Sequence, residues 1–198
     1  MTQRRPRPGI ALVTLVCSTL VLSTLVSATD LSAQTKVTMT FTPQDQTFTE
    51  AAEAYRQLWA EEGTRMIEGL ERGSGLKFLE KDVKAVIFEG PSSSGFGDKP
   101  MMLRASYPEP TKRATLVHEL GHRLQVGVAG DVDEHEVLFY WIYDVWVNLW
   151  GKQFADEQVL VEKARRGPYP RAWDAALALS ASERAARFRQ LLNSKRNR

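Results

Sequence analysis

The order of apolar and polar residues predicts a strand, a long helix and two further strands in the first half of the chain. Residues 36–42 alternate Val, Met and Phe with Lys and Thr, which is typical of a half-buried strand. From Thr42-Pro43 onwards apolar residues recur at helical spacing, until the Gly-Ser-Gly stop at 73–75. Two apolar runs, 83–88 and 101–106, predict the second and third strands, paired with each other.

The second half of the chain is expected to be mostly helical, with two short helices after Gly167-Pro168 and three longer ones at 111–126, 131–150 and 152–165. The helix at 131–150 is strongly apolar. We interpret it as a buried central helix because its apolar run is too short for a membrane span and contains Asp144 and Asn148. This order of elements indicates an α+β fold with a short mixed sheet, in one domain over residues 34–198.

Residues 1–33 have the layout of a secretory signal peptide. Arg4, Arg5 and Arg7 precede an apolar run, and small residues offer cleavage after Ala28 or after Ala33. A membrane anchor is the alternative, but the run is near the lower limit for crossing a bilayer and contains Ser, Thr and Cys. We therefore expect an exported bacterial protein, periplasmic or secreted, without a stable membrane span after cleavage.

Composition excludes several other classes of protein. The chain has 198 residues, of which 43% are hydrophobic and 25% charged, which argues against disorder, collagen or a coiled coil. Its net charge of +2 resides in residues 1–33, so the remainder is neutral and has no electrostatic footprint for nucleic acid. The single cysteine, Cys17, also lies in that segment, so no thiol is available to the mature domain as nucleophile or metal ligand.

The main chemical signal is the motif His118-Glu119-Leu120-Gly121-His122 within the helix expected at 111–126. Histidines four residues apart lie one turn apart on the same helix face, so they can bind one metal ion together. A carboxylate beside them can take a proton from a metal-bound water and pass it to a leaving group. Glu119 is therefore the candidate catalytic residue, with His118 and His122 as metal ligands.

A catalytic zinc site needs a third protein ligand. His135 is the one remaining histidine and we favour it, with Glu136 as the alternative. Glu136, Tyr140 and Asp144 form a polar stripe on the helix at 131–150, and a stripe that faced the metal would make Glu136 the ligand. The carboxylates at 131–134 are explained largely as helix-capping residues, Asp131 and Glu134 having the spacing of a capping box.

Two further features have both a structural and a functional interpretation. The Gly-, Ser- and Pro-rich stretch 90–100 is either a mobile flap over a cleft, with Phe96 as its apolar contact, or a surface connection. Tyr140 and Tyr143 have side chains that can donate a hydrogen bond to a developing oxyanion, although packing at the edge of the core explains either one more simply.

Around these histidines the chain resembles the zincins, the superfamily of HExxH zinc metallopeptidases. The resemblance covers about residues 101–150 and implies that His118 and His122 bind Zn²⁺ and that Glu119 is the general base. It also implies a small twisted sheet beside the active-site helix, with the edge strand 101–106 aligning a peptide or protein substrate by backbone hydrogen bonds.

The resemblance does not supply the third ligand. The metzincin extension of the motif is absent from residues 123–128, and the Glu-x-x-x-Asp pattern of gluzincins is absent after Glu134 and Glu136. The function expected is an exported zinc-dependent metallopeptidase. The alternative is a zincin-like metal-binding module without hydrolytic activity, which would have a structural or partner-binding role and a metal site closed by four protein ligands.

Overall fold

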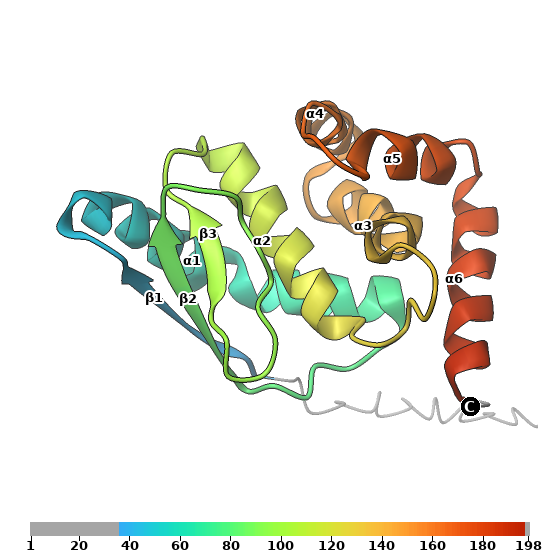
Figure 1. The fold of residues 1–198 in the computed structure, drawn as a ribbon, viewed down its shortest axis with the longest axis horizontal. Coiled ribbons are helices and arrows are strands. Elements are labelled where there is room, and N and C mark those ends of the chain that lie inside the picture. The colour runs from blue at the N-terminus through green and yellow to red at the C-terminus, as the bar shows by residue number, and fades with distance from the viewer. Residues whose placement is uncertain (1–35, 197–198) are drawn as a thin grey trace, which may run out of the picture. The chain divides into compact units, whose positions relative to one another are not determined.

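The computed structural model describes residues 36–196, and the expected signal peptide, with both of its cleavage positions, lies outside these residues. Three strands and six α-helices form an α+β fold, which confirms the fold class (Figure 1). The strands are β1 (Thr38–Pro43), β2 (Asp82–Phe88) and β3 (Met101–Arg104), adjacent in that order.

One face of the sheet is buried and the other is largely open. Val37, just before β1, and Met39 and Phe41 within it are buried, while the threonines between them are exposed. Both strand pairs are parallel, so the expected mixed sheet was wrong for the described residues. A helix returns the chain from β1 to β2 and a long loop returns it from β2 to β3, so successive strands run in the same direction.

The first long helix begins later than its sequence predicted. Pro43 ends β1, and Asp45 then accepts a hydrogen bond from the Thr47 backbone N–H to cap a short 3-10 turn, Gln46–Phe48. Helix α1 (Thr49–Ser74) follows and ends at Gly75, whose φ of 70° requires the left-handed region that glycine tolerates.

The motif helix α2 (Glu109–Leu124) lies between β3 and helix α3 (Glu134–Trp150), as Figure 1 shows. Gly121 permits this close packing, because a Cβ atom there would lie 2.7 Å from Cδ1 of the fully buried Leu138. The apolar side of α3 is buried as expected, with Phe139 and Trp146 among its inaccessible residues. Helix α3 is thereby packed closely against the motif helix α2.

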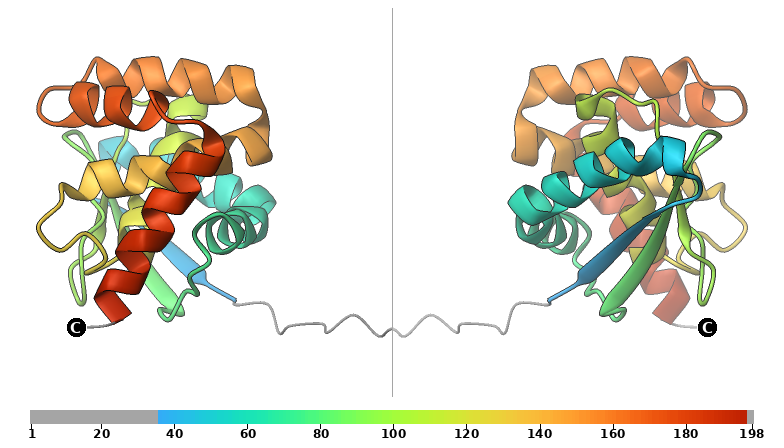
Figure 2. Two further views of the ribbon diagram at one scale, coloured as in Figure 1. Left: turned by 90° about the vertical axis from the view of Figure 1, so that its right-hand side faces the viewer. Right: turned by 90° about the vertical axis from the view of Figure 1, so that its left-hand side faces the viewer.

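The remaining helices are α4 (Lys152–Lys163), α5 (Tyr169–Leu177) and α6 (Ala181–Arg196), which at 16 residues is not the short helix expected. Helices α4 and α5 lie side by side (Figure 2), and all three contact α3. The capping box expected before α6 is present, since the Glu183 carboxylate accepts from the Ser180 backbone N–H at 2.8 Å. No helix among residues 36–196 combines the length and the apolar character needed to cross a membrane.

Candidate metal centre

Two imidazoles of the motif meet on one buried face of α2. The Nε2 atoms of His118 and His122 are 3.2 Å apart, and the two residues are 0% and 6% exposed. The helical register places them one turn apart, as their spacing predicted. Two adjacent ring nitrogens in a buried position are the arrangement that a shared metal ion requires.

The third imidazole comes from the first turn of α3. The Asp133 carboxylate accepts from the backbone N–H of His135 and caps this helix, so the expected box of Asp131 with Glu134 is not the cap. The His135 ring centroid lies 4.8 Å from that of His122 and 5.6 Å from that of His118. One nitrogen from each of the three histidines lies within 4.8 Å of the others, so the described residues form a possible three-histidine metal site.

Glu136 faces a different part of the protein from His135. Its Oε1 accepts a hydrogen bond from the Tyr140 hydroxyl at 2.5 Å, and Asp144 farther along the same stripe pairs with Arg184 of α6 at 2.7 Å. The polar stripe of α3 therefore faces α6 rather than the histidines. Of the two candidates for third ligand, the structure brings His135 to the cluster.

Neither tyrosine considered for oxyanion binding is directed to the histidines by its hydrogen bond. The Tyr140 hydroxyl is engaged by Glu136, and the Tyr143 hydroxyl donates to Asp156 Oδ1 at 2.8 Å. Both contacts fix the rings at the edge of the core, as the simpler interpretation held.

Glu162 of α4 is a site residue that the sequence analysis missed. Its Oε1 lies 2.9 Å from Nδ1 of His118, and its Oε2 accepts from Trp173 Nε1 at 2.9 Å. The carboxylate thus lies against two buried ring nitrogens, one through a hydrogen bond from Trp173 and one through a close ion-pair contact with His118, and it leaves Nε2 of His118 for a metal. The signal was present: Glu162 continues the buried stripe of Ala155 and Val159 at helical spacing.

Burial and the neighbouring charges shift the pKa values of the three imidazoles in different directions. Burial lowers the pKa of His118, but the Glu162 carboxylate outweighs it and the net pKa is raised. Burial, aided by the charge of His118, lowers the pKa of His122 to about 2 and that of His135 to about 4. Two of the three candidate ligands are therefore neutral at pH 7, the form that binds metal.

Glu119 is buried beside this cluster, with 3% of its surface exposed. Burial raises its pKa to about 7, although the charge of His118 acts in the opposite direction. A carboxyl group with a pKa near neutrality can both accept and return a proton at physiological pH, which suits a general base.

Tyr169, at the start of α5, is the second site residue that the sequence analysis missed. Its ring centroid is 4.5 Å from that of His135, and its ring stacks on His118 at 5.9 Å. Burial raises the pKa of its hydroxyl to about 12, so the hydroxyl keeps its proton at pH 7. The hydroxyl forms a hydrogen bond with Arg165 and still has its own proton to donate. Tyr169 lies 47 positions after His122 and 51 after His118 in the sequence.

The loop 90–100 reaches the histidines and is anchored to α2. Arg123 donates from Nε to the Ser94 carbonyl at 2.7 Å and from a terminal nitrogen to the Lys99 carbonyl at 2.9 Å. Phe96, 43% exposed, lines a cavity of about 170 Å³ together with His122. This location matches the flap interpretation, although the loop is fixed by hydrogen bonds rather than unattached.

The outer edge of β3 is already occupied. Ser93 forms an antiparallel bridge with Met102, with backbone hydrogen bonds of 2.9 and 2.8 Å, and the Ser92 hydroxyl accepts from the Arg104 N–H. The expectation that strand 101–106 itself presents a free edge to a substrate was therefore wrong. The segment around Ser93 now forms that edge of the sheet.

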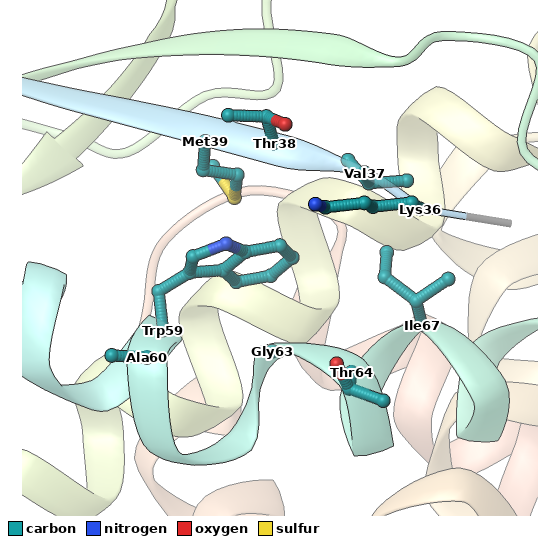
Figure 3. Close-up of a pocket in the computed structure, with 9 residues that line it drawn as sticks. All are labelled: Lys36, Val37, Thr38, Met39, Trp59, Ala60, Gly63, Thr64 and Ile67. Atoms are coloured by element: carbon teal, nitrogen blue, oxygen red, sulfur yellow. The ribbon is translucent and has the colours of Figure 1, made fainter.

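A larger cavity lies away from the histidines, between β1 and α1 (Figure 3). It has a volume of about 560 Å³, and the Trp59 ring lies across it below Met39 and Lys36. None of the three histidines lines it, so size alone does not mark the site.

Comparison of this chain with protein-family models, with curated proteins and with solved structures found no match. The function of the chain is therefore inferred from its own residues and their geometry.

Proposed function

We propose that this protein is a zinc-dependent peptidase in which His118, His122 and His135 hold the metal and Glu119 is the general base. The observation that carries the proposal is the convergence of three imidazoles, from two helices, beside a buried carboxylate. The His-Glu-x-x-His spacing supports it, because that spacing puts the carboxylate next to two of the ligands.

The donor set fits a catalytic zinc ion. Imidazole nitrogen is a preferred zinc ligand, and three protein ligands leave a position open for water or substrate. Zinc bound there would polarise the scissile carbonyl and lower the pKa of a coordinated water to about 7. Glu162 fits the role of the carboxylate that orients a ligating histidine, since it lies against the far nitrogen of His118.

The chain's own side chains would move and hold the protons. Glu119 would accept a proton from the attacking water and deliver it to the leaving nitrogen, a transfer favoured by its pKa of about 7, raised by burial. Tyr169 would donate a hydrogen bond to the oxyanion that forms at the scissile carbonyl. The backbone edge near Ser93 would align an extended peptide, with Phe96 closing the His122 side.

The substrates proposed are peptides or proteins met outside the cytoplasm. The signal-peptide layout of residues 1–33 favours export, which would place the activity in the periplasm or the medium. A purely structural metal site would need a fourth protein ligand. Glu136, the candidate for that role, is instead hydrogen-bonded to Tyr140, so the geometry favours an open, hydrolytic site.

A Glu119→Gln variant tests the proposal. We expect it to bind one zinc per chain, measured by elemental mass spectrometry, and to lose hydrolysis of a mixed peptide library by at least about 100-fold. Glu109→Gln is the matched control, because Glu109 is an exposed residue at the start of the same helix. Undiminished hydrolysis by the Glu119 variant, or a wild-type protein that binds no zinc, would contradict the proposal.

A further inference from the structure

Arg165 places a positive charge at the edge of the candidate metal centre. Its guanidinium lies between two aromatic rings, 5.3 Å from the centroid of Tyr169 and 5.6 Å from that of Tyr107. Its charge interacts with Glu119 and with His118. The side chain is 20% exposed, so a ligand can reach it while the two rings hold it in place.

The Arg165 guanidinium has N–H groups that lack a close acceptor within the described part of the chain. It lies 3.4 Å from Thr115 Oγ1 and 3.6 Å from Glu162 Oε1, and both distances are longer than the 2.7–2.9 Å of a strong charged hydrogen bond. Glu162 contacts two other buried groups more closely, Nδ1 of His118 at 2.9 Å and Nε1 of Trp173 at 2.9 Å. The guanidinium also forms a hydrogen bond with the Tyr169 side chain, and the donors that remain of its five N–H groups suit Arg165 to bind a carboxylate through two parallel bonds.

Arg165 follows helix α4, and the point at which it approaches α2 sets its distance from the reacting bond. Thr115, which it approaches, precedes Glu119 by four residues, and so lies just over one turn, roughly 6 Å, along the helix. One peptide residue spans about 3.8 Å between Cα atoms. An anion held by Arg165 would therefore lie about one to two residues from a carbonyl positioned near Glu119.

Another cation near this point is already neutralised. Arg104 also lies 5.6 Å from the Tyr107 ring, but it forms an ion pair with Glu89. Its side chain is 41% exposed, which makes it a weaker anchor than Arg165. Arg165 is the less closely paired of these two cations, since its nearest carboxylate oxygen, Glu162 Oε1, is 3.6 Å away.

We propose that Arg165 binds the carboxylate of the substrate, and that the site releases the C-terminal residue of short peptides. This inference rests on the proposed peptidase function. In the reaction, the hydroxyl of water adds to the penultimate carbonyl carbon, the peptide C–N bond breaks, and a proton passes to the leaving nitrogen. The products are a shortened peptide with a new carboxylate and a free amino acid, whose own carboxylate Arg165 holds throughout.

The test compares peptides that differ only at the C-terminus. The zinc-loaded enzyme is given a library of short peptides prepared both as free acids and as amides, with cleavage followed by mass spectrometry. We expect kcat/KM to be about 10–100-fold higher for the acids, the discrimination typical of a charged hydrogen-bonded pair. Arg165→Met should lower the rate for acids to that for amides, Arg165→Lys should retain part of the difference, and the exposed neighbour control Arg166→Met should retain all of it.

A binding measurement separates recognition from chemistry. In a Glu119→Gln background, calorimetry should show a free-acid peptide binding about 10–100-fold more tightly than its amide, and added Arg165→Met should abolish this difference. Zinc content and thermal unfolding of each variant confirm that the fold is intact.

The outcomes distinguish the two proposals. Equal cleavage of acids and amides would overturn the inference about Arg165 and leave the peptidase proposal standing. An absence of any cleavage would overturn both. Arg165-dependent cleavage of amides that carry Asp or Glu after the scissile bond would support the anion site but assign it to an acidic side chain.

Discussion

Replacing Glu162 with Gln should weaken zinc binding without removing a zinc ligand. One oxygen of the wild-type carboxylate lies 2.9 Å from Nδ1 of His118, and the other accepts a hydrogen bond from Nε1 of Trp173 at 2.9 Å. A glutamine has one carbonyl oxygen and one NH₂ group, so one of the two donors must lose its acceptor.

The expected loss of zinc affinity follows from the burial of both side chains. His118 and Glu162 have side chains that are 1% and 2% exposed, so water cannot replace the lost acceptor. An unsatisfied buried donor costs about 1–3 kcal/mol. If the amide faces Nδ1 instead, the His118 proton moves to Nε2, the nitrogen that binds metal. Either route predicts zinc affinity about 10–100-fold lower, which agrees with the effect typical of carboxylates that orient ligating histidines.

Zinc affinity is measured by competition with a chromophoric chelator at pH 7.5. Glu157→Gln is the control, because Glu157 is exposed on the same helix and should leave the affinity unchanged. Metal-free samples are compared by circular dichroism to show that the fold survives. If Glu162→Gln bound zinc as tightly as the wild type, the assignment of His118 as a ligand oriented by Glu162 would be wrong.

Three further predictions concern the same centre. His135→Ala should lose zinc at micromolar concentrations whereas Glu136→Gln keeps it, as elemental analysis would show; the reverse pattern would make Glu136 the ligand. Tyr169→Phe should lower kcat about 100-fold or more with zinc content unchanged, because one hydrogen bond to the oxyanion is lost; an unchanged kcat would remove Tyr169 from the mechanism. Between pH 6 and pH 5 the metal-free protein should lose about 1.4 kcal/mol of stability, measured by urea unfolding. Burial lowers the folded-state pKa of His122 and His135, so acid favours the unfolded state by about two protons, while Glu119, whose pKa is raised by burial, opposes this by about one; stability that rose on acidification would refute these environments.

The local features of this protein were set by its sequence. Alternation of apolar and polar residues located β1, apolar runs located β2 and β3, and helical spacing located α2, α3 and α4 to within about three residues, whereas α1 begins later than expected. The His-Glu-x-x-His spacing fixed His118, Glu119 and His122 on one helix face, because the period of an α-helix depends on the backbone alone. These predictions needed no knowledge of which elements pack together.

The tertiary structure decided how the site is completed. His135 and Glu136 are adjacent in sequence, and only the packing of α3 against α2 and α6 determines which of them meets the motif. Glu162 and Tyr169 reach His118 from helices that come later in the chain. The edge of β3 is likewise closed by a loop contact at Ser93 that no period in the sequence encodes. Contacts between segments distant in sequence depend on how whole helix faces fit together, so they emerge only when the core is assembled.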